Sequence, residues 1–355
     1  MKLFKVIALC VTMLLLPQAS ALAQTKVILN YGLSYFLVST APLFSVPVQM
    51  GFWKQEGLDV SVEGASGGST ALQQLATRQV GMTVTGVPSL MQLKESGAPI
   101  IAVGSAYSQN PFYPAVLEDS PIRSIKDFKG KTVAVTSLTV SHVYWLNAIL
   151  AAEGMKPSDV TLVPVGGAGG NVLHAMRTGE VDVFQAFDAA YANLETIGAK
   201  LRLFDDLPYL KNLSFIQGIY VNEDTLKSNP KMIVGMLRGI AKAVVFTKEN
   251  PEAAIRMHWK QFPSSKPIGV DDAKAMKDAL IVLKAQLRSY DPMGVNGKGF
   301  GEVTDDQVTA VRDVLFQNGA ITKRLDPSRY YTAQFIAAAN DFDHEEIRKL
   351  ASAAH

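Results

Sequence analysis

The chain has 355 residues, of which 48% are hydrophobic and only 19% charged, a balance typical of a well-packed globular protein. Its 34 basic and 32 acidic residues nearly cancel and form no basic patch, which argues against a nucleic-acid partner. At this length two domains are expected, and no apolar run after the N-terminus is long enough to cross a membrane.

The first 23 residues have the pattern of a secretory signal peptide. Lys2 and Lys5 precede an apolar run from Val6 to Leu16, and Ala21-Leu22-Ala23 supplies small residues for cleavage after Ala23. A transmembrane anchor is the weaker alternative, because the run falls short of the ~20 residues of a span. Cleavage would also remove the only cysteine of the chain, so we expect an exported protein without disulfides.

Short strands and helices alternate over the first part of the mature chain. The predicted strands are 26–31, 60–63, 81–85 and 99–104. The predicted helices are 42–51, 70–79 and 88–95. Such alternation implies an α/β fold with a mainly parallel sheet and helices on both faces.

A second α/β unit is predicted to begin near Ser120. Its strands are predicted at 132–136, 160–165, 181–186 and 200–204, and its helices at 125–131, 141–152, 171–178 and 189–197. A strand at 215–222 then returns to the first unit. The chain would therefore cross between two lobes near 113–118 and 217–222 and form a hinge. We place lobe II at 116–219 and lobe I at 24–115 and 220–355.

The C-terminal part is predicted to be helical. The helices are expected at 230–248, 251–261, 271–288 and 305–318. Thr304 and Gln307 have the spacing of a capping box at the start of the last of these. The tail after Leu350 is expected to fray.

A glycine-rich motif occurs twice, about a hundred residues apart. Each copy has a helix end, a strand, a glycine turn, a short helix and another strand, and the turns are Gly64–Thr70 and Gly166–Asn171. Glycines let the backbone approach a ligand and leave N–H groups free at a helix start. Two such turns indicate a cleft for a small polar or anionic ligand, although a plain helix cap would explain either turn alone.

The sequence contains no catalytic or metal-binding pattern. The internal histidines have no metal-ligand spacing, and there is no Gly-x-Ser-x-Gly elbow, phosphate loop or HExxH helix. His142 lies at a predicted helix start, whose positive end would lower its pKa and keep the imidazole neutral. We therefore expect no enzyme activity, no cofactor and no metal.

Candidate ligand-binding residues follow the strands, because ligands of open α/β sheets bind outside the carboxyl ends of strands. The glycine turns supply Ser66, Gly68, Ser69, Thr70, Gly169 and Asn171. Strand ends and helix starts supply Val87, Pro88, Ser137, Thr139, Ser141, His142, Phe187 and Asp188. The aromatic candidates are Tyr35, Phe36, Tyr107 and Tyr191, and Phe112 and Tyr113 belong to the same group of loop aromatics.

Asp188 is the only carboxylate expected at the pocket floor. It either pairs with a cationic group of the ligand or caps the helix that begins at Ala189. No arginine falls at a predicted cleft position. An anion would therefore be held by amides and hydroxyls rather than by a salt bridge.

Several stretches together resemble the periplasmic substrate-binding proteins of ABC importers, in the nitrate/sulfonate/taurine and thiamine-pyrimidine-precursor group. The matching stretches are 51–60, 66–70, 120–135 and 178–183. The resemblance covers roughly residues 25 to 250. It implies a type II periplasmic-binding fold, with two Rossmann-like lobes joined by a two-strand hinge that close around one ligand. It also implies a periplasmic monomer that delivers a small-molecule solute to an inner-membrane permease.

The solute expected from this resemblance is a small organic or oxyanionic compound. The stretch from Ser137 to His142 is similar to the helix start that faces the sulfonate in taurine-type members, and Asp188 opposite would suit a zwitterion. The aromatic side chains would equally suit a pyrimidine-like ring. The alternative is a lyase or synthase on the same fold, against which the export signal argues. The cysteine-rich motif of fungal-type pyrimidine synthases is absent.

Overall fold

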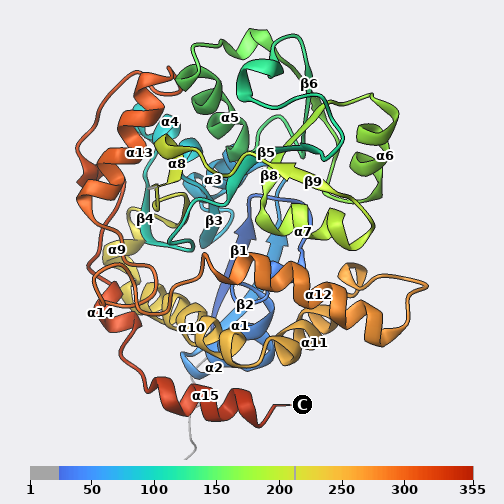
Figure 1. Ribbon diagram of the computed structural model, residues 1–355. Coiled ribbons are helices and arrows are strands. Elements are labelled where there is room, and N and C mark those ends of the chain that lie inside the picture. Colours follow the sequence, from blue (N-terminus) through green and yellow to red (C-terminus); the bar gives the residue numbers. More distant parts are fainter. Residues whose placement is uncertain (1–23, 212, 355) are drawn as a thin grey trace, which may run out of the picture.

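The computed structural model describes residues 24–211 and 213–354. The predicted signal peptide, residues 1–23, lies outside the described residues. Two five-stranded sheets organise the described part of the chain, one above the other in Figure 1. No helix in these two ranges combines the length and the apolar character that a membrane crossing needs.

The first sheet has the strand order β2-β1-β3-β10-β4. Its strands are β1 (Thr25–Tyr31), β2 (Leu58–Gly64), β3 (Met82–Gly86), β4 (Ile100–Ser105) and β10 (Gln217–Asn222). β10 is antiparallel to both of its neighbours, whereas β1, β2 and β3 pair in parallel. Every residue of β3 and β4 is buried, as expected for strands covered on both faces.

The second sheet repeats this plan with the order β7-β6-β8-β5-β9. Its strands are β5 (Phe112–Leu117), β6 (Thr132–Val135), β7 (Thr161–Pro164), β8 (Val183–Phe187) and β9 (Leu201–Leu203). Here β5 is the antiparallel strand, in the same place that β10 has in the first sheet. The predicted duplication of an α/β unit is confirmed. We call the parts built around the first and second sheets lobe I and lobe II.

Most helices begin within a few residues of their predicted starts. Those before the second crossing are η1 (Val38–Thr40), α1 (Ser45–Gln49), α2 (Phe52–Gln55), α3 (Gly68–Ala76), α4 (Val87–Glu95), η2 (Ile125–Phe128), α5 (Ser141–Ala152), η3 (Pro157–Asp159), α6 (Gly170–Thr178) and α7 (Asp188–Thr196). The later helices are α8 (Pro208–Lys211), α9 (Thr225–Ser228), α10 (Pro230–Glu249), α11 (Pro251–Gln261), η4 (Pro263–Ser265), α12 (Asp272–Leu287), α13 (Asp305–Gln317), η5 (Pro327–Arg329), α14 (Ile336–Ala339) and α15 (His344–Ser352).

The predicted capping box of α13 is confirmed, since Thr304 and Gln307 exchange backbone-to-side-chain hydrogen bonds of 2.9 and 3.3 Å. The expectation of a frayed tail after Leu350 is wrong. α15 continues to Ser352, and Ala351 is fully buried. Asn250 fixes this end of the chain, because its Nδ2 donates to the carbonyl of Ala351.

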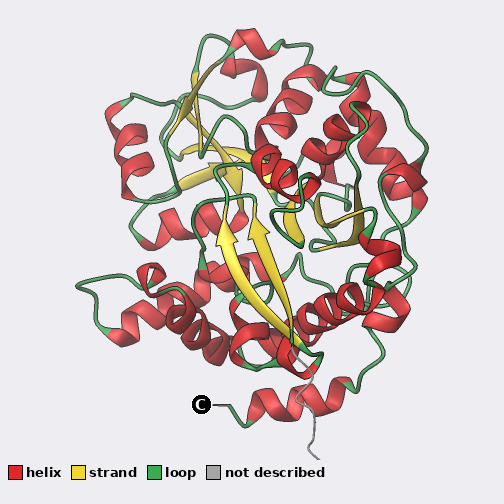
Figure 2. Ribbon diagram, turned by 180° about the vertical axis from the view of Figure 1, so that it is seen from behind, coloured by secondary structure: helices red, strands yellow, loops and turns green. Residues whose placement is uncertain are grey.

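The chain passes between the sheets through residues 106–111 and 204–216. The strand predicted at 215–222, which returns to lobe I, is present as β10, whereas the stretch 113–118, predicted only as a crossing, is strand β5 of lobe II. The sequence analysis did not take into account that this stretch is apolar enough to be buried inside a sheet. The lobe limits after residues 115 and 219 fall inside these strands and stay a prediction. Seen from behind, β1 and β2 of the first sheet point their carboxyl ends toward lobe II (Figure 2).

The C-terminal helices surround the first sheet but also reach the second lobe. α10 packs on α2 and β2, and α11 packs on α1. α12 contacts η1 in lobe I and α7 in lobe II, so it bridges the lobes (Figure 1).

Candidate functional site

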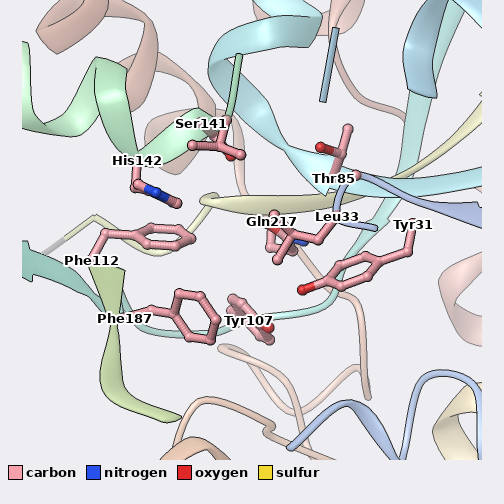
Figure 3. A pocket seen from close by; sticks show the side chains of 11 residues that line it. Tyr31, Leu33, Thr85, Tyr107, Phe112, Ser141, His142, Phe187 and Gln217 are labelled. Carbon is pink, nitrogen blue, oxygen red and sulfur yellow. The ribbon is translucent and has the colours of Figure 1, made fainter. Parts of the chain in front are cut away.

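A cavity lies between the two lobes, where the strand ends of both sheets meet. Its lobe I side is formed by Tyr31, Gly32, Leu33, Thr85, Tyr107 and Gln217, and its lobe II side by Phe112, Val140, Ser141, His142 and Phe187 (Figure 3). The free volume is about 20 Å³, room for roughly one water molecule. A solute can therefore enter only when the lobes or the lining side chains move.

The cavity combines aromatic rings with neutral polar groups. The rings of Phe112 and Phe187 meet edge to face, with centroids 6.1 Å apart, and Tyr107 lies beside them (Figure 3). Thr85, Ser141 and Gln217 supply hydroxyl and amide groups. Among the described residues that line the cavity, none carries an acidic or basic side chain other than His142. This lining suits a ring that offers hydrogen-bonding groups better than an isolated charge.

His142 is neutral in this site. Only 2% of the residue is exposed, and its Nε2 lies 3.3 Å from Thr136 Oγ1. Burial lowers the pKa of His142 to about 3. The neutral imidazole was predicted from a helix end, whereas desolvation is the cause that the structure shows.

The first glycine turn contacts lobe II directly. The hydroxyls of Ser137 and Thr139 donate to the carbonyl of Ser66 over 3.3 and 3.4 Å. A Cβ on Gly67 would overlap the side chain of Thr139. This part of the turn therefore lets the lobes approach each other, whereas the sequence analysis assigned it only to ligand approach.

A second close approach joins Gly86, at the end of β3, to Ser141, at the start of α5. A Cβ on Gly86 would overlap the Cβ and Oγ of Ser141. Gly68 has a different neighbour, because a side chain there would meet Thr85 and Ser89 of its own lobe. We therefore expect Gly86 to control how closely the lobes fit, whereas Gly68, predicted to let the backbone approach a ligand, packs within lobe I.

Several other predicted residues lie away from the cavity. Ser69 and Thr70 are half-buried in the first turn of α3, and Thr70 Oγ1 accepts a 3.3 Å hydrogen bond from Ser66. Val87 and Pro88 are buried in the first turn of α4, where the N–H of Val87 donates to Ile216. None of these four lines the cavity.

The second glycine turn is also outside the cavity. Asn171 is exposed, and its amide donates to the carbonyl of Val165 within the turn. Gly169 precedes α6, and a side chain on the neighbouring Gly170 would enter open space. The two turns are alike in sequence, but the first hydrogen-bonds to the opposite lobe, whereas a Cβ on Gly166, Gly167 or Gly170 of the second would meet open space.

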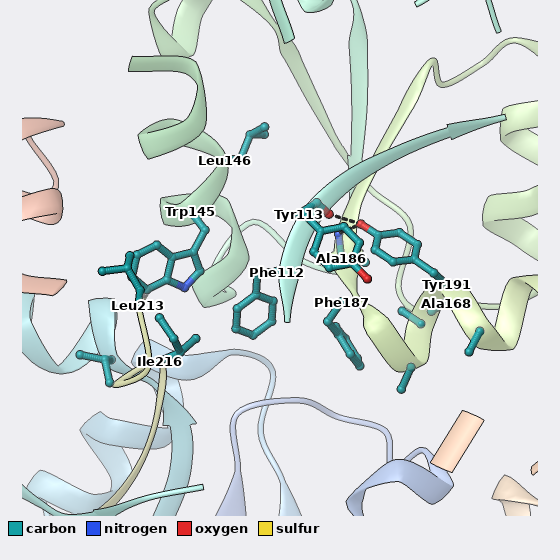
Figure 4. Close-up of a cluster of buried hydrophobic side chains, with 14 of the residues drawn as sticks. Phe112, Tyr113, Trp145, Leu146, Ala168, Ala186, Phe187, Tyr191, Leu213 and Ile216 are labelled. Carbon is teal, nitrogen blue, oxygen red and sulfur yellow. Dashed lines mark hydrogen bonds between the residues drawn. The ribbon is translucent and has the colours of Figure 1, made fainter. Parts of the chain in front are cut away.

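Tyr191 is a core residue of lobe II rather than part of the cavity (Figure 4). Its hydroxyl donates to the carbonyl of Tyr113 and accepts from the N–H of Ala186 over 2.7 Å. The rings of Tyr113 and Tyr191 stack with centroids 5.3 Å apart. The helical position one turn after Phe187 thus faces the sheet, whereas Phe187 itself faces the cavity.

Asp188 joins the two lobes through an ion pair. Its carboxylate accepts hydrogen bonds from Arg288 Nε at 3.0 Å and Nη2 at 2.7 Å, and from the hydroxyl of Tyr113. Arg288 is the C-cap residue of α12, which also contacts η1 of lobe I, whereas Asp188 begins α7 in lobe II. Burial raises the pKa of Asp188, and these hydrogen bonds oppose the rise.

This ion pair corrects two predictions. The helix begins at Asp188 and not at Ala189, and the Asp188 side chain makes no capping hydrogen bond, so the helix-cap alternative is wrong. An arginine does reach this region, although the sequence analysis placed none there. Arg288 was missed because it lies a hundred residues away, in a helix whose position depends on tertiary packing.

Of the predicted residues, Tyr107, Phe112, Ser141, His142 and Phe187 line the cavity. Sequence reasoning missed most of the lobe I lining, including Tyr31, Thr85 and Gln217. Tyr31 and Thr85 lie at or next to the ends of their strands, and Gln217 begins the returning strand. The candidates were sought after each strand, so the last strand residues, which also point into the cleft, were passed over. Tyr35 and Phe36 lie on a separate cavity.

A second buried histidine fixes the loop that carries part of the cavity. His258 is fully buried, with Nδ1 3.1 Å from Ser45 Oγ and Nε2 3.2 Å from the carbonyl of Phe36. The two contacts are satisfied together when Nε2–H donates to Phe36 and Nδ1 accepts from Ser45. Burial lowers the pKa of His258 to about 4, so the neutral form is the folded form at pH 7.

Because two histidines are buried in the neutral form, we expect the protein to become less stable in mild acid. An unfolded histidine takes up a proton near pH 6.5, whereas His142 and His258 resist it down to about 3 and 4. The unfolded state then binds more protons, so the free energy of unfolding falls as the pH drops from 6.5 toward 4. Urea unfolding at several pH values should show that His258→Gln reduces this slope by up to about 1.4 kcal/mol per pH unit. The exposed His174→Gln is the control and should keep the wild-type slope.

No group of three or more His, Cys, Asp or Glu side chains that could hold a metal ion occurs within residues 24–211 and 213–354.

The chain is similar to several known proteins. A family model described as NMT1/THI5 like matches residues 42–254. The chain is 22% identical over 334 residues to a protein of Brucella abortus (strain 2308) provisionally named a binding protein, covering 94% of this chain and 98% of that one.

Two further relatives have different functions, since one is named as a synthase and the other as a binding protein. A 4-amino-5-hydroxymethyl-2-methylpyrimidine phosphate synthase of Saccharomyces cerevisiae is 24% identical over 250 residues, covering 65% of this chain and 71% of the synthase. The crystal structure of the periplasmic aliphatic sulphonate binding protein SsuA from Escherichia coli matches with a TM-score of 0.61 and 18% identity, over 86% of this chain and 91% of that chain. The predicted type II periplasmic-binding fold is confirmed by this structural likeness.

Proposed function

Because the chain belongs to the NMT1/THI5-like family, whose model matches more than half of it, we propose that it is the extracytoplasmic solute-binding component of an ABC importer. The observation that carries the proposal is the cavity between the lobes, which is lined from both sheets and spanned by two chain crossings. Movement about these crossings would open the cavity, admit a solute and close over it. The solute-bound protein would then meet an inner-membrane permease in the periplasm, as a monomer.

The lining favours a ring-containing solute with neutral hydrogen-bonding groups. Four aromatic residues, Tyr31, Tyr107, Phe112 and Phe187, offer faces and edges to a flat molecule. Thr85, Ser141 and Gln217 can each donate or accept a hydrogen bond. A sulfonate or nitrate would have no cationic side chain from the described lining to pair with, so only neutral donors and the start of α5 would stabilise it. Of the predicted ligand classes, the pyrimidine-like ring therefore fits best.

The test is a thermal-unfolding series with candidate solutes on the mature chain from Gln24. A hydroxymethylpyrimidine, an aromatic acid, taurine, an alkanesulfonate and nitrate would each be added at high concentration. A true ligand at a hundred times its Kd adds about 2.7 kcal/mol of stability, roughly a 5 °C rise in Tm. We expect the rise with a ring compound. A rise with taurine or the alkanesulfonate alone would contradict the ring preference but keep the transport role.

The yeast synthase relative makes an enzyme the alternative function. Mass spectrometry of the solute recovered after long incubation separates the two functions. An importer component returns the solute unchanged in equal amount, whereas conversion of the solute would contradict the transport proposal.

A further inference from the structure

A second cavity, of about 420 Å³, lies on the other side of the loop that follows β1. Leu33 of this loop lines the interlobe site, whereas Tyr35 and Phe36 line the second cavity. One wall is the C-terminal half of α7 in lobe II, and the opposite wall is α12 with the end of α11. We call it the α7–α12 cavity. Its volume lies within the range of small-molecule sites.

One end of the α7–α12 cavity is aromatic. Phe36 and Phe262 stack almost in parallel, with centroids 4.2 Å apart and planes 5° apart, and Trp259 lies nearby in the lining. The stack joins the β1 loop to the end of α11, and His258 holds the same loop through the carbonyl of Phe36. These rings thus form a fixed surface on which another flat ring can pack.

Several polar groups of the lining are occupied within the protein, whereas the buried indole N–H of Trp259 has no partner among the described residues. Asn193 donates to the carbonyl of Ala168 at 2.7 Å, Thr196 to that of Asn193, and Ser265 to that of Phe262. The charged residues of the lining, Lys274 and Asp278, neutralise each other in an ion pair of 2.5 Å. Such a lining offers apolar surface but no unpaired charge to a ligand.

We propose that the α7–α12 cavity is a second binding site, for an uncharged compound of one or two aromatic rings. The ring would lie between the Phe36–Phe262 stack and the aliphatic side chains of Ile197 and Val282. A charged ligand would lose its hydration without gaining a partner, so it is excluded. The site is separate from the interlobe cavity and does not depend on the transport role.

The probe for the test is 2-naphthol, which is uncharged at neutral pH and has two rings. Fluorescence anisotropy of its emission should report binding to the mature protein with a Kd on the order of 100 μM. Ala279→Phe, which fills the cavity from α12, should weaken binding at least tenfold. Thr196→Phe fills it from α7 and supplies the answer if the first variant does not fold. Ala273→Phe, on an exposed position of α12, is the matched control and should bind like wild type.

The interlobe site is distinguished by Phe112→Leu, which removes an aromatic ring from the interlobe lining but none from the α7–α12 cavity, and should leave 2-naphthol binding unchanged. Three results would overturn the proposal. The first is no binding by wild type up to 1 mM, a concentration about ten times the expected Kd. The second is an unchanged Kd in folded filling variants, and the third is loss of binding in Phe112→Leu. The last result would place the probe in the interlobe site instead.

Discussion

Gly86→Ala should weaken binding of the imported solute by about 30- to 150-fold, the equivalent of the 2–3 kcal/mol that an overpacked contact costs. The added Cβ would overlap Ser141 of the opposite lobe, at the edge of the interlobe cavity. The φ of Gly86 is −69°, which any residue adopts, so lobe I itself should fold normally. The substitution should therefore act by hindering lobe closure. Titration calorimetry with the solute identified in the thermal series measures the loss of affinity.

Ser141→Gly provides the matched test of this cause. It removes the two atoms that a Cβ on Gly86 would overlap, so Gly86→Ala should cost much less affinity in the Ser141→Gly background. Gly170→Ala in the second glycine turn is the control and should bind normally, because a side chain there enters open space. An equal loss with and without Ser141 would show that Gly86 does not act through this contact.

The fold could be predicted from local pattern because each α/β unit carries its own periodicity. Alternating strands and helices, the repeated glycine motif and the capping box of α13 all depend on residues close in sequence, and all are present in the structure. β5 was interpreted as a crossing because its antiparallel pairing with β8 and β9 depends on partners 60 to 90 residues away. Strand pairing over such separations cannot be recognised from a short stretch of the sequence.

A binding cleft between the two lobes was predicted, but only some of the residues that line the cavity were named in advance. Ser141, His142 and Phe187 line the cavity, as the rule of strand ends and helix starts predicts. The second glycine turn was overestimated, because sequence similarity between the copies does not fix which turn faces the other lobe. Arg288 could not be found in this way. Its role depends on how α12 crosses from lobe I to lobe II, which no local pattern encodes.

Arg288→Gln should weaken solute binding by about 5- to 30-fold at neutral pH. Without Arg288 the buried carboxylate of Asp188, only 5% exposed, keeps Tyr113 as its remaining partner in the described structure. Breaking a fully buried pair costs about 3–5 kcal/mol, but the Arg288 side chain is 57% exposed, so we expect about 1–2 kcal/mol. The cost applies to the closed lobes alone, because separation of α7 from α12 rehydrates Asp188. Small-angle scattering of the solute-bound variant should show a larger radius of gyration.

Two further results identify the ion pair as the cause. Burial raises the pKa of Asp188, and removal of Arg288 raises it further, so protonation should restore much of the affinity of Arg288→Gln as the pH falls toward 5. The double variant Asp188→Asn/Arg288→Gln should bind better than Arg288→Gln alone, because no buried charge is left unpaired. A ligand contact at Asp188 predicts the opposite. Arg288→Gln would then free the carboxylate and tighten binding of cationic solutes, whereas Asp188→Asn would weaken binding of those solutes only.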